Sequence, residues 1–561
     1  MPLCSSCGGK AFIPRVPVDL SALHDKLRTE FGPASIQPDD VASVLQDIQR
    51  DLEDYEAEIS RLERLRQEKE RLQEYATQLR YLLSPFRKVP DELLREIFDL
   101  SCDMNTFRVV NPGKRLPMHT YQALGSKPAM VISSVCSRWR RNALSMPVIW
   151  SRISLQWKLD SQDDGYEDED TEVFFPLSNF LDRSKQCSMT VNLDIHGDPF
   201  LKPKVLHPSL EKLFGQITRW KDLSFNSDYY DVQELLDCDR ISSASFPVLS
   251  ILHTSACVDE KNIGPFLGAA PNLRSLSLAS TLRDVPENFS YSSQLSHLDF
   301  VPDKYHIPNL FDRCPRLFSL RITEWLYRNS ENHKMIISSS RLEILTVRHG
   351  CYWADDASDS VFPFFRLPSL KALHLEPFML MTKGGKSWCY FDSFMAFVQR
   401  SSFQLTTFSI QQLPISDANL IDILVLLPTL QNLTVDDSGI SPEYSSISSG
   451  FIESLCSYRT SSLRPQEAAI IPRLRSLRLL NVGVTTFNDQ SVLEMVQSRW
   501  NPTRLNDVGT SVLEVDCLRA FTMTFPNRSE AEAGVYSSLA PIEKDGMMIV
   551  VRLGQSDYPR L

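Results

Sequence analysis

The segment Leu370-Lys371-Ala372-Leu373-His374-Leu375 carries leucines at its first, fourth and sixth positions, and this pattern decides the fold of most of the chain. Apolar residues at alternate positions predict a strand with one buried face, so Leu373 and Leu375 should point into a core. Conservative variants recur at Leu273/Leu276/Leu278, Leu295/Leu298/Phe300, Leu317/Leu320/Ile322, Leu342/Leu345/Val347, Leu405/Phe408/Ile410, Leu430/Leu433/Val435 and Leu474/Leu477/Leu479. Weaker copies begin at Trp220, Leu249 and Leu518.

The spacing of these copies resembles that of a leucine-rich repeat. Successive first positions lie 22 to 44 residues apart, and most intervals fall within the 20–29 residues of such repeats. The resemblance implies a curved parallel sheet, with strands on the concave face and returning helices outside. The asparagine that commonly follows the strand is missing from most copies, so the repeats are degenerate. Residues 545–551 are predicted to form a last strand that closes the array.

The polar positions of the repeats form a candidate target-binding face. The third, fifth and seventh residues of each copy should project away from the leucines, onto the concave side. The inserted loop around residues 377–400, with Trp388, Tyr390 and Phe391, is expected to cover this face as a lid. The alternative is that the face is merely solvated. Its residues are His297, Asp299, Arg321, Thr346, Arg348, His374, Glu376, Asn432, Asp436 and Arg478.

Two short amphipathic helices are predicted upstream of the repeats. Pro90 suits a helix start, and Asp91 and Glu92 place negative charge in the first turn, where the helix dipole favours it. Apolar residues then recur at helical spacing in residues 93–98 and again in residues 132–144, before Pro147. A unit this small buries little core, so part of its apolar surface should meet another chain. The alternative is a hairpin packed on the rest of the protein.

The sequence motifs of these helices resemble an F-box, the module that docks proteins onto the adaptor subunit of cullin-RING ubiquitin ligases. Val89-Pro90-Asp91-Glu92-Leu93-Leu94 and Val135-Cys136-Ser137-Arg138-Trp139-Arg140 match its two halves, and Trp150 matches a closing tryptophan. The match is best to the F-box proteins of mushroom-forming fungi, with an insertion at about 104–130. The resemblance implies that adaptor-binding residues lie among Val89, Pro90, Leu93, Leu94, Ile97, Phe98, Val135, Trp139 and Trp150, some of which must instead hold the two helices together.

A long helix is predicted at the N-terminal side of the F-box. Leu45, Ile48, Leu52, Tyr55, Ile59 and Leu62 follow alternating steps of three and four, which is typical of a coiled-coil seam. After a phase slip, the seam resumes as Leu65, Leu72, Ala76, Leu79 and Leu83, with Lys69 at an apolar position. A homodimer through this helix and a helix that folds back on its own chain both fit the pattern.

Composition narrows the function classes. The net charge of −11 argues against a general nucleic-acid binder, which needs a basic face. The 12 cysteines lack the dense spacing of a secreted disulfide scaffold, and no run of eighteen apolar residues predicts a membrane span. We therefore expect a cytoplasmic or nuclear protein without a membrane or nucleic-acid partner.

Motifs for catalysis or cofactors are weak. Cys4 and Cys7 form half of a zinc knuckle, but two further ligands at knuckle spacing are missing, so a solvated tail is favoured over zinc. Lys383-Gly384-Gly385-Lys386-Ser387 resembles the end of a phosphate-binding loop but has Leu380 where the first glycine belongs, which favours a surface turn. An enzyme hidden in the repeats has no supporting motif. We expect no catalytic residue, cofactor or metal site.

These expectations combine into an α/β chain with six segments. They are a disordered tail (1–37), a coiled-coil helix (38–84), an all-α F-box (85–155), an acidic linker (156–180), a leucine-rich-repeat-like solenoid (181–553) and a C-terminal tail (554–561). The F-box and the repeats are expected to have separate cores. The resemblance implies a substrate receptor of an SCF-type ubiquitin ligase, bound through the adaptor to cullin and through the repeats to an unidentified protein. The alternative is a non-degradative scaffold.

Overall fold

The computed structural model divides the chain into two units, residues 1–94 and 95–561, with the division inside helix α3 (Asp91–Ser101). It describes residues 14–28, 37–82, 85–109, 127–158, 171–196, 208–227, 245–255, 268–281, 293–301, 310–324, 336–349, 360–378, 388, 390–440, 444–457, 469–480, 482, 487–500, 515–526, 528 and 534–553. None of the helices in these ranges combines the length and apolarity that a membrane crossing requires.

The first unit is built on the predicted long helix. Helix α2 (Pro38–Leu82) spans 45 residues, and its start carries Asp39 and Asp40, which interact favourably with the helix dipole. A 3-10 turn, η2 (Pro85–Lys88), precedes α3. Part of the tail expected to be disordered is instead helical, as α1 (Leu20–Arg28). Asp19 caps this helix by accepting a hydrogen bond from the backbone N–H of Ala22 at 2.9 Å, a local signal that the composition of the tail concealed.

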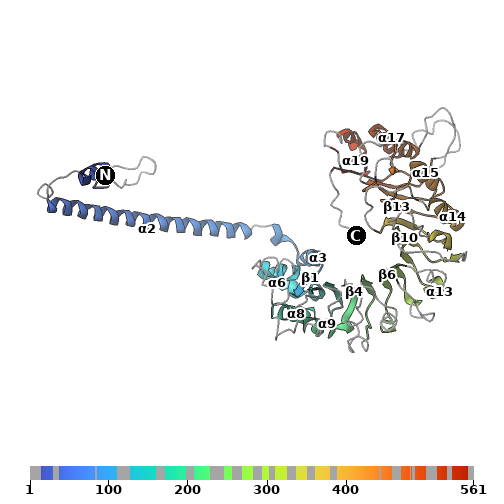
Figure 1. The fold of residues 1–561 in the computed structure, drawn as a ribbon, viewed down its shortest axis with the longest axis horizontal. Helices are drawn as coiled ribbons and strands as arrows, with labels where there is room; N and C mark the ends of the chain where they lie inside the picture. Colours follow the sequence, from blue (N-terminus) through green and yellow to red (C-terminus); the bar gives the residue numbers. More distant parts are fainter. Residues whose placement is uncertain are drawn as a thin grey trace. The chain divides into compact units, whose positions relative to one another are not determined.

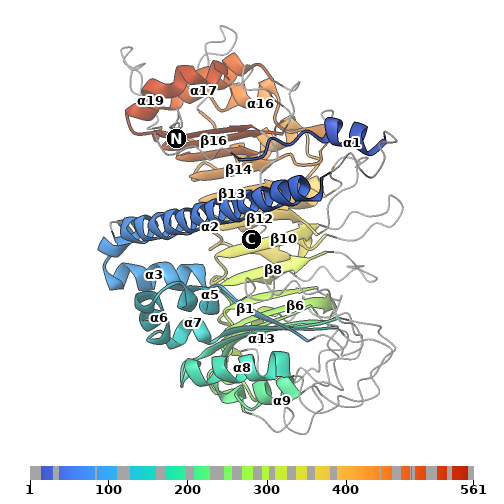
Figure 2. The ribbon, with the colours of Figure 1, turned by 90° about the vertical axis from the view of Figure 1, so that its left-hand side faces the viewer.

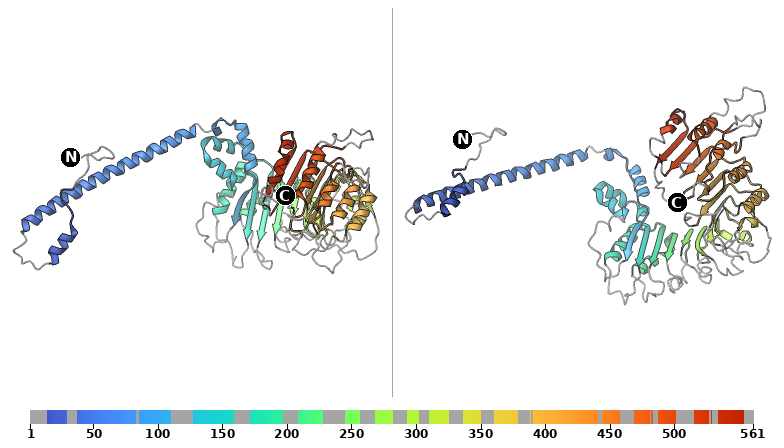
Figure 3. Two further views of the ribbon diagram at one scale, coloured as in Figure 1. Left: turned by 90° about the horizontal axis from the view of Figure 1, so that it is seen from above. Right: turned by 45° about the horizontal axis from the view of Figure 1, so that its top comes forward.

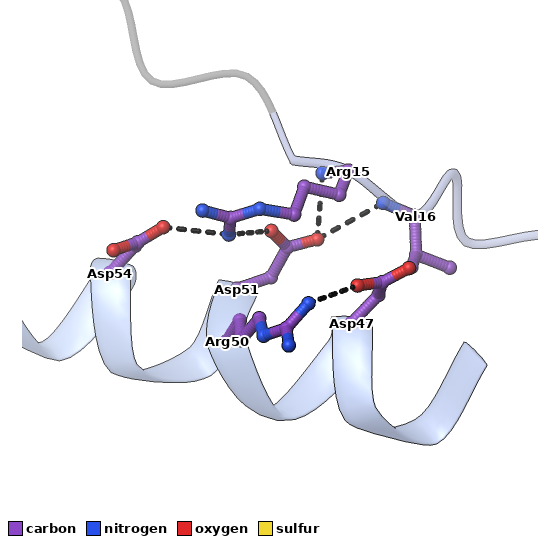
Figure 4. A network of polar contacts seen from close by, with 6 residues as sticks. All are labelled: Arg15, Val16, Asp47, Arg50, Asp51 and Asp54. Atoms are coloured by element: carbon purple, nitrogen blue, oxygen red, sulfur yellow. Dashed lines mark hydrogen bonds and ion pairs between the residues drawn. The ribbon is translucent and has the colours of Figure 1, made fainter. Parts of the chain in front are cut away.

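The segment before α1 docks on the side of α2 (Figure 4). Asp51 accepts hydrogen bonds from the backbone N–H groups of Arg15 and Val16 at 2.7 and 3.0 Å. The Arg15 guanidinium Nη1 also lies 2.8 Å from Asp51 and 2.7 Å from Asp54. Asp51 is 5% exposed, so this contact fixes residues 15 and 16 on one flank of α2.

The second unit contains a parallel sheet of 15 strands that follow one another in chain order (Figures 1 and 2). A separate pair, β9 (Ile337–Ser338) and β11 (Phe365–Arg366), forms a small second sheet. The predicted copies, the weaker ones and the closing strand all lie in the large sheet. Its strands are β1 (Asn105–Val109), β2 (Arg152–Lys158), β3 (Met189–His196), β4 (Trp220–Ser227), β5 (Ile251–Thr254), β6 (Ser275–Thr281), β7 (His297–Val301), β8 (Ser319–Thr323), β10 (Ile344–His349), β12 (Ala372–Pro377), β13 (Thr407–Gln411), β14 (Asn432–Asp436), β15 (Ser476–Leu480), β16 (Ala520–Phe525) and β17 (Met548–Leu553).

Helices cover one side of this sheet (Figure 3). The leucines of the repeated pattern are buried. Leu370, Leu373 and Leu375 are at most 1% exposed, as the alternation predicted. The fold is therefore an open α/β layer structure. Its helical segments are α5 (Pro128–Val135), α6 (Ser137–Leu144), α7 (Pro147–Trp150), α8 (Thr171–Ser184), α9 (Pro208–Phe214), η3 (Ile217–Arg219), α13 (Leu310–Arg313), η5 (Phe362–Phe364), α14 (Phe391–Ser401), α15 (Asp417–Val425), α16 (Ser449–Ser454), α17 (Asp489–Trp500), η8 (Gly534–Leu539) and α19 (Ala540–Lys544).

The sheet begins inside the segment that the sequence assigned to an F-box insertion, so the expectation of separate cores is wrong. Strand β1 pairs in parallel with β2, and β2 pairs with β3. The ring of Phe180 on α8 lies 5.1 Å from Phe107 of β1 and 4.8 Å from Trp150 of α7. Buried Asn105 donates its amide to the carbonyls of Ile149 and Arg152 at 2.8 and 2.9 Å. The helical residues from 127 to 150 and the start of the sheet therefore share one core.

The expected lid over the polar face is wrong for Trp388, whereas residues 379–387 and 389 of the same loop lie outside the described residues. Trp388 is 5% exposed, and its ring lies 5.4 Å from Phe394 and 6.4 Å from Phe362. Its backbone N–H donates to the carbonyl of Pro414 at 2.8 Å. Phe391 begins helix α14. Burial of the large apolar area of Trp388 anchors this part of the segment in the core, whereas Tyr390 and Phe391 are half-buried.

Candidate binding surfaces

The two helices with F-box-like motifs are held together by an aromatic pair and a polar contact. Phe98 on α3 is fully buried and lies 4.9 Å from the ring of Trp139 on α6. The Arg95 guanidinium Nε donates to the side-chain oxygen of Asn142 at 3.1 Å. Cys136 is the N-cap of helix α6, and its Sγ accepts from the backbone N–H of Trp139 at 3.5 Å. These contacts fix α6 against the second half of α3.

The predicted adaptor-binding residues separate into exposed and buried groups. Pro90, Leu93, Ile97 and Val135 are exposed, and Val89 and Trp139 are half-buried. Leu94, Phe98 and Trp150 are fully buried, so their assignment to a docking surface is wrong and they belong to the core. In the sequence, an apolar residue at these positions fits a docking surface and a packed core equally well. Trp150 makes this plain, since its indole N–H donates to the carbonyl of Ala143 at 2.8 Å.

The exposed residues are unusually apolar for a surface. Leu93, Ile97 and Leu100 recur at steps of four and three along α3, with 50%, 43% and 84% of their surface exposed. Val131, Val135, Leu144 and Val148 on the neighbouring short helices are 38% to 57% exposed. We call Ile97, Leu100, Val131, Val135, Leu144 and Val148 the apolar surface. A concentration of large apolar residues on one small module is typical of a protein interaction site.

The opposite face of the sheet carries an unbroken row of polar residues, one strand after another. Five of the predicted target-binding positions belong to this row, namely Asp299, Arg321, Thr346, His374 and Arg478, and Arg348 and Glu376 lie two residues further along their strands. The row reads Thr106, Ser154, Asn192, Ser224, His253, Ser277, Asp299, Arg321, Thr346, His374, Ser409, Thr434, Arg478 and Thr522 from β1 to β16.

A four-residue charge cluster lies in the middle of this row. Asp299 Oδ2 is 3.6 Å from Arg321 Nη1 and 3.7 Å from Arg348 Nη1. Arg348 Nε also lies 3.7 Å from Glu376 Oε2. We call Asp299, Arg321, Arg348 and Glu376 the charge cluster. Each side chain keeps between 17% and 41% of its surface exposed, so the cluster is balanced in charge and open to a ligand.

His374 lies beside the cluster on β12. Burial lowers the pKa of His374 below its usual value of 6.5, Glu376 opposes the shift and Arg321 adds to it. His374 is therefore a neutral imidazole at pH 7, with one N–H donor and one acceptor nitrogen.

The remaining predicted residues are placed differently along this face. His297 is exposed, and its Nδ1 lies 2.8 Å from the Ser296 hydroxyl. Asp436 accepts from the backbone N–H and hydroxyl of Ser438 at 2.9 and 2.5 Å, so it stabilises the turn after β14. Asn432 donates to the Thr407 hydroxyl at 3.2 Å. Thr346 is only 4% exposed.

The sequence reasoning missed the N-terminal third of this face. A polar ladder crosses β1 to β3, where Arg108 donates to Gln156 at 3.0 Å and Gln156 donates to Asp194 at 3.4 Å. These strands lack the repeated leucine pattern. The signal that could have revealed them is the strict alternation of Met189-Thr190-Val191-Asn192-Leu193-Asp194-Ile195, whose apolar members are at most 3% exposed.

A buried histidine–glutamate pair joins the ends of two neighbouring strands. His349, the last residue of β10, places its Nδ1 2.6 Å from Oε2 of Glu324, which follows β8, and both side chains are at most 2% exposed. Glu324 also accepts from the backbone N–H of Val361 at 2.8 Å and from the Ser360 hydroxyl at 3.4 Å, so it ties three chain segments together. Because the Ser360 hydroxyl donates to the carboxylate and not to the imidazole, we assign the pair a structural role.

Metal and nucleotide sites lack structural support in the part of the chain that is described. Within those ranges, no group of three or more histidine, cysteine or acidic side chains is close enough to hold a metal ion. No disulfide joins the described cysteines. Cys4, Cys7 and residues 383–387 lie outside the described residues.

Comparison with models of known protein families and with curated proteins finds no match for this chain.

Proposed function

We propose that this chain is the substrate-recruiting F-box subunit of a cullin-RING ubiquitin ligase. In this proposal, α3 and α5–α7 bind the adaptor, and the sheet, read as a degenerate leucine-rich-repeat array, binds the target. The ligase then accelerates ubiquitin transfer by holding target and charged carrier at high effective concentration. The proposal places the protein in the cytoplasm or nucleus, where that machinery operates.

One observation carries the proposal. The helices that bear the two F-box-like motifs expose Ile97, Leu100 and Val135, whereas the motif residues Leu94, Phe98 and Trp150 are fully buried. An F-box needs both sets, because a small interface depends on a few apolar anchors held by a rigid core. The polar row supplies the second requirement, a long surface to which many strands contribute side chains.

The test is purification of the tagged full chain from its own cells, with and without proteasome inhibition, followed by mass spectrometry. We expect adaptor and cullin in both samples, and at least one further protein that accumulates only under inhibition. Absence of the adaptor from both samples would contradict the proposal.

A non-degradative scaffold is the second candidate, because the apolar seam of α2 is exposed and suited to assembly. The turnover of a bound protein separates the two functions. If the chain is a scaffold, mutating the apolar surface should leave the half-life of the bound protein unchanged. If the chain is a substrate receptor, the same mutation should lengthen that half-life.

A prediction concerns the charge cluster as part of the target site. Replacing Arg321 and Arg348 by glutamine should weaken target capture at least about tenfold, because two partly desolvated guanidinium groups are lost from a central position. Glutamine is preferred to glutamate, since Asp299 and Glu376 would repel a new carboxylate and disturb the sheet. Adaptor recovery should stay unchanged.

The matched control is Lys371→Gln, which removes an exposed ion pair of 2.8 Å with Glu343 just before β12. Target capture is measured by pull-down of the protein identified under proteasome inhibition. Equal capture by the double variant and the control would exclude the charge cluster from the target site.

A further inference from the structure

The seam of α2 is an apolar stripe whose leucines and Ile59 are largely exposed among the described residues of the first unit, whereas Ile48 and Ala76 are half-buried. Leu45, Leu52, Ile59, Leu62 and Leu72 keep between 52% and 68% of their surface exposed. The segment at Arg15 does not cover the stripe, because it docks at Asp51 and Asp54 on the flank. A stripe that continues over most of a 45-residue helix requires a partner helix of similar length.

The spacing of the seam is the same from either end. From Leu45 to Leu62 the steps are three, four, three, four and three, and from Leu62 to Leu79 they are three, four, three, four and three again. The phase slip therefore falls at Leu62, the centre of the pattern. In a parallel pair each seam residue faces its own copy, so the spacing need not be symmetric. In an antiparallel pair the symmetric spacing lets every seam residue face another seam residue.

With Leu62 on the two-fold axis, residue numbers of facing positions sum to 124. Large residues then face matching or smaller ones, and Lys69 faces the ring of Tyr55, a suitable partner for a cation. The two consecutive three-residue steps around Leu62 lie opposite each other in the two helices, so both helices change their winding at the same place. The facing pairs are Leu45 with Leu79, Ile48 with Ala76, Leu52 with Leu72, Tyr55 with Lys69 and Ile59 with Leu65.

The charge distribution favours the same direction. Residues 38–60 contain eight acidic side chains and one arginine, a net charge of −7, whereas residues 61–82 contain six basic and four acidic ones, a net charge of +2. An antiparallel pair brings the acidic half of each helix against the basic half of the other. A parallel pair would stack the two acidic halves and place Lys69 against Lys69 in the seam, and like charges at such positions are destabilising.

We propose that α2 pairs with α2 of a second copy of this chain in an antiparallel coiled coil, centred on Leu62. This inference does not rest on adaptor binding, since it uses only residues of the first unit. An antiparallel pair puts the C-terminal ends of the two helices at opposite ends of a rod about 65 Å long, so the two second units leave the rod at separate points.

The test uses charge rescue in the full-length protein, with the dimerisation constant measured by sedimentation equilibrium. Tyr55→Lys sets a new lysine against Lys69 of the other copy, twice in each antiparallel dimer, and should weaken dimerisation at least about tenfold. Adding Lys69→Glu converts both contacts into ion pairs and should return the constant to within about threefold of the starting value. The matched control is Gln46→Lys, which adds the same charge at a position beside the seam and should change little.

Each other outcome overturns the proposal. A parallel pair predicts no rescue, because in the double variant the two new lysines face each other and the two new glutamates replace the facing pair of Lys69 side chains. A wild-type protein that stays monomeric at about 100 µM would show that the seam is covered by the chain itself or by a different protein. A dimer insensitive to Tyr55→Lys would place the contact elsewhere.

Discussion

Replacing Ile97 and Val135 by aspartate should abolish recovery of the adaptor with this protein. Both side chains are exposed, at 43% and 57%, so the change removes apolar anchors without opening the core. Central anchors of an interface contribute about 2 kcal/mol or more each, and a buried carboxylate adds a desolvation cost. We therefore expect the affinity for the adaptor to fall at least about a thousandfold, measured by titration calorimetry with purified adaptor.

The control for this experiment is Val425→Asp on α15, which is 56% exposed and lies far along the sheet from the helical module. It should leave adaptor binding and melting unchanged. Trp139→Ala is a poor probe, because Trp139 packs 4.9 Å from the buried ring of Phe98 and its loss would disturb the fold. Normal adaptor affinity in a folded Ile97→Asp, Val135→Asp protein would refute the F-box assignment.

The largest stability effect is expected at Arg499 on α17. This side chain is fully buried, and burial lowers the pKa of its guanidinium to about 10, so it remains charged at pH 7. Its Nη1 and Nη2 donate to the carbonyls of Ile471 and Ile470 at 3.0 and 2.7 Å, and its Nε donates to the carbonyl of Leu455. One guanidinium therefore satisfies carbonyls from the segment after α16 and the segment before β15.

Arg499→Met should lower the free energy of unfolding by about 3 kcal/mol. The carbonyls of Leu455 and Ile470 lose the guanidinium donor at about 1–3 kcal/mol each, whereas the Ile471 carbonyl keeps the backbone N–H of Leu474 at 3.2 Å, and relief from burying a charge offsets part of the loss. Arg499→Lys should be nearly as harmful, since an ammonium group lacks the planar fork that reaches three acceptors. The measurement is resistance of β15 and β16 to proteolysis and hydrogen exchange, which reports local opening.

Arg473→Met is the matched control, because Arg473 pairs with Asp516 at 3.0 Å with 48% of its side chain exposed. Exposed ion pairs contribute about 0–1 kcal/mol, so this variant should melt close to the wild type. If both variants behave alike, the buried arginine does not hold α16, α17 and β15 together.

Local pattern was sufficient for most of the fold. The alternating leucines predicted β6 to β8, β10 and β12 to β15 because a two-residue period leaves strands little freedom of register. Alternating steps of three and four residues between apolar positions likewise predicted the helix α2. The pattern could not place β1, because Asn105-Thr106-Phe107-Arg108-Val109 is short and becomes a strand only by pairing with β2, 47 residues downstream.

The candidate sites were predictable in composition but not in exposure. Leu93 and Leu94 are adjacent and chemically identical, yet one is 50% exposed and the other fully buried. Only the rotation of α3 within the fold decides between them. The polar row was predicted where leucines marked the opposite face, as at Arg321 and His374, and was missed where isoleucine, valine and tryptophan took their place. Asp436 was predicted to bind the target, but its carboxylate accepts hydrogen bonds within the turn after β14.

The order of the strands has a mechanical consequence. In the large sheet of the described residues the strands pair in chain order, with β9 and β11 left out, and β17 pairs only with β16. Pulling on the C-terminal end should therefore peel β17 away first, then β16, in a series of small steps rather than one large rupture. A force-extension curve of the second unit should resemble the opening of a zipper, with work spread evenly along the extension.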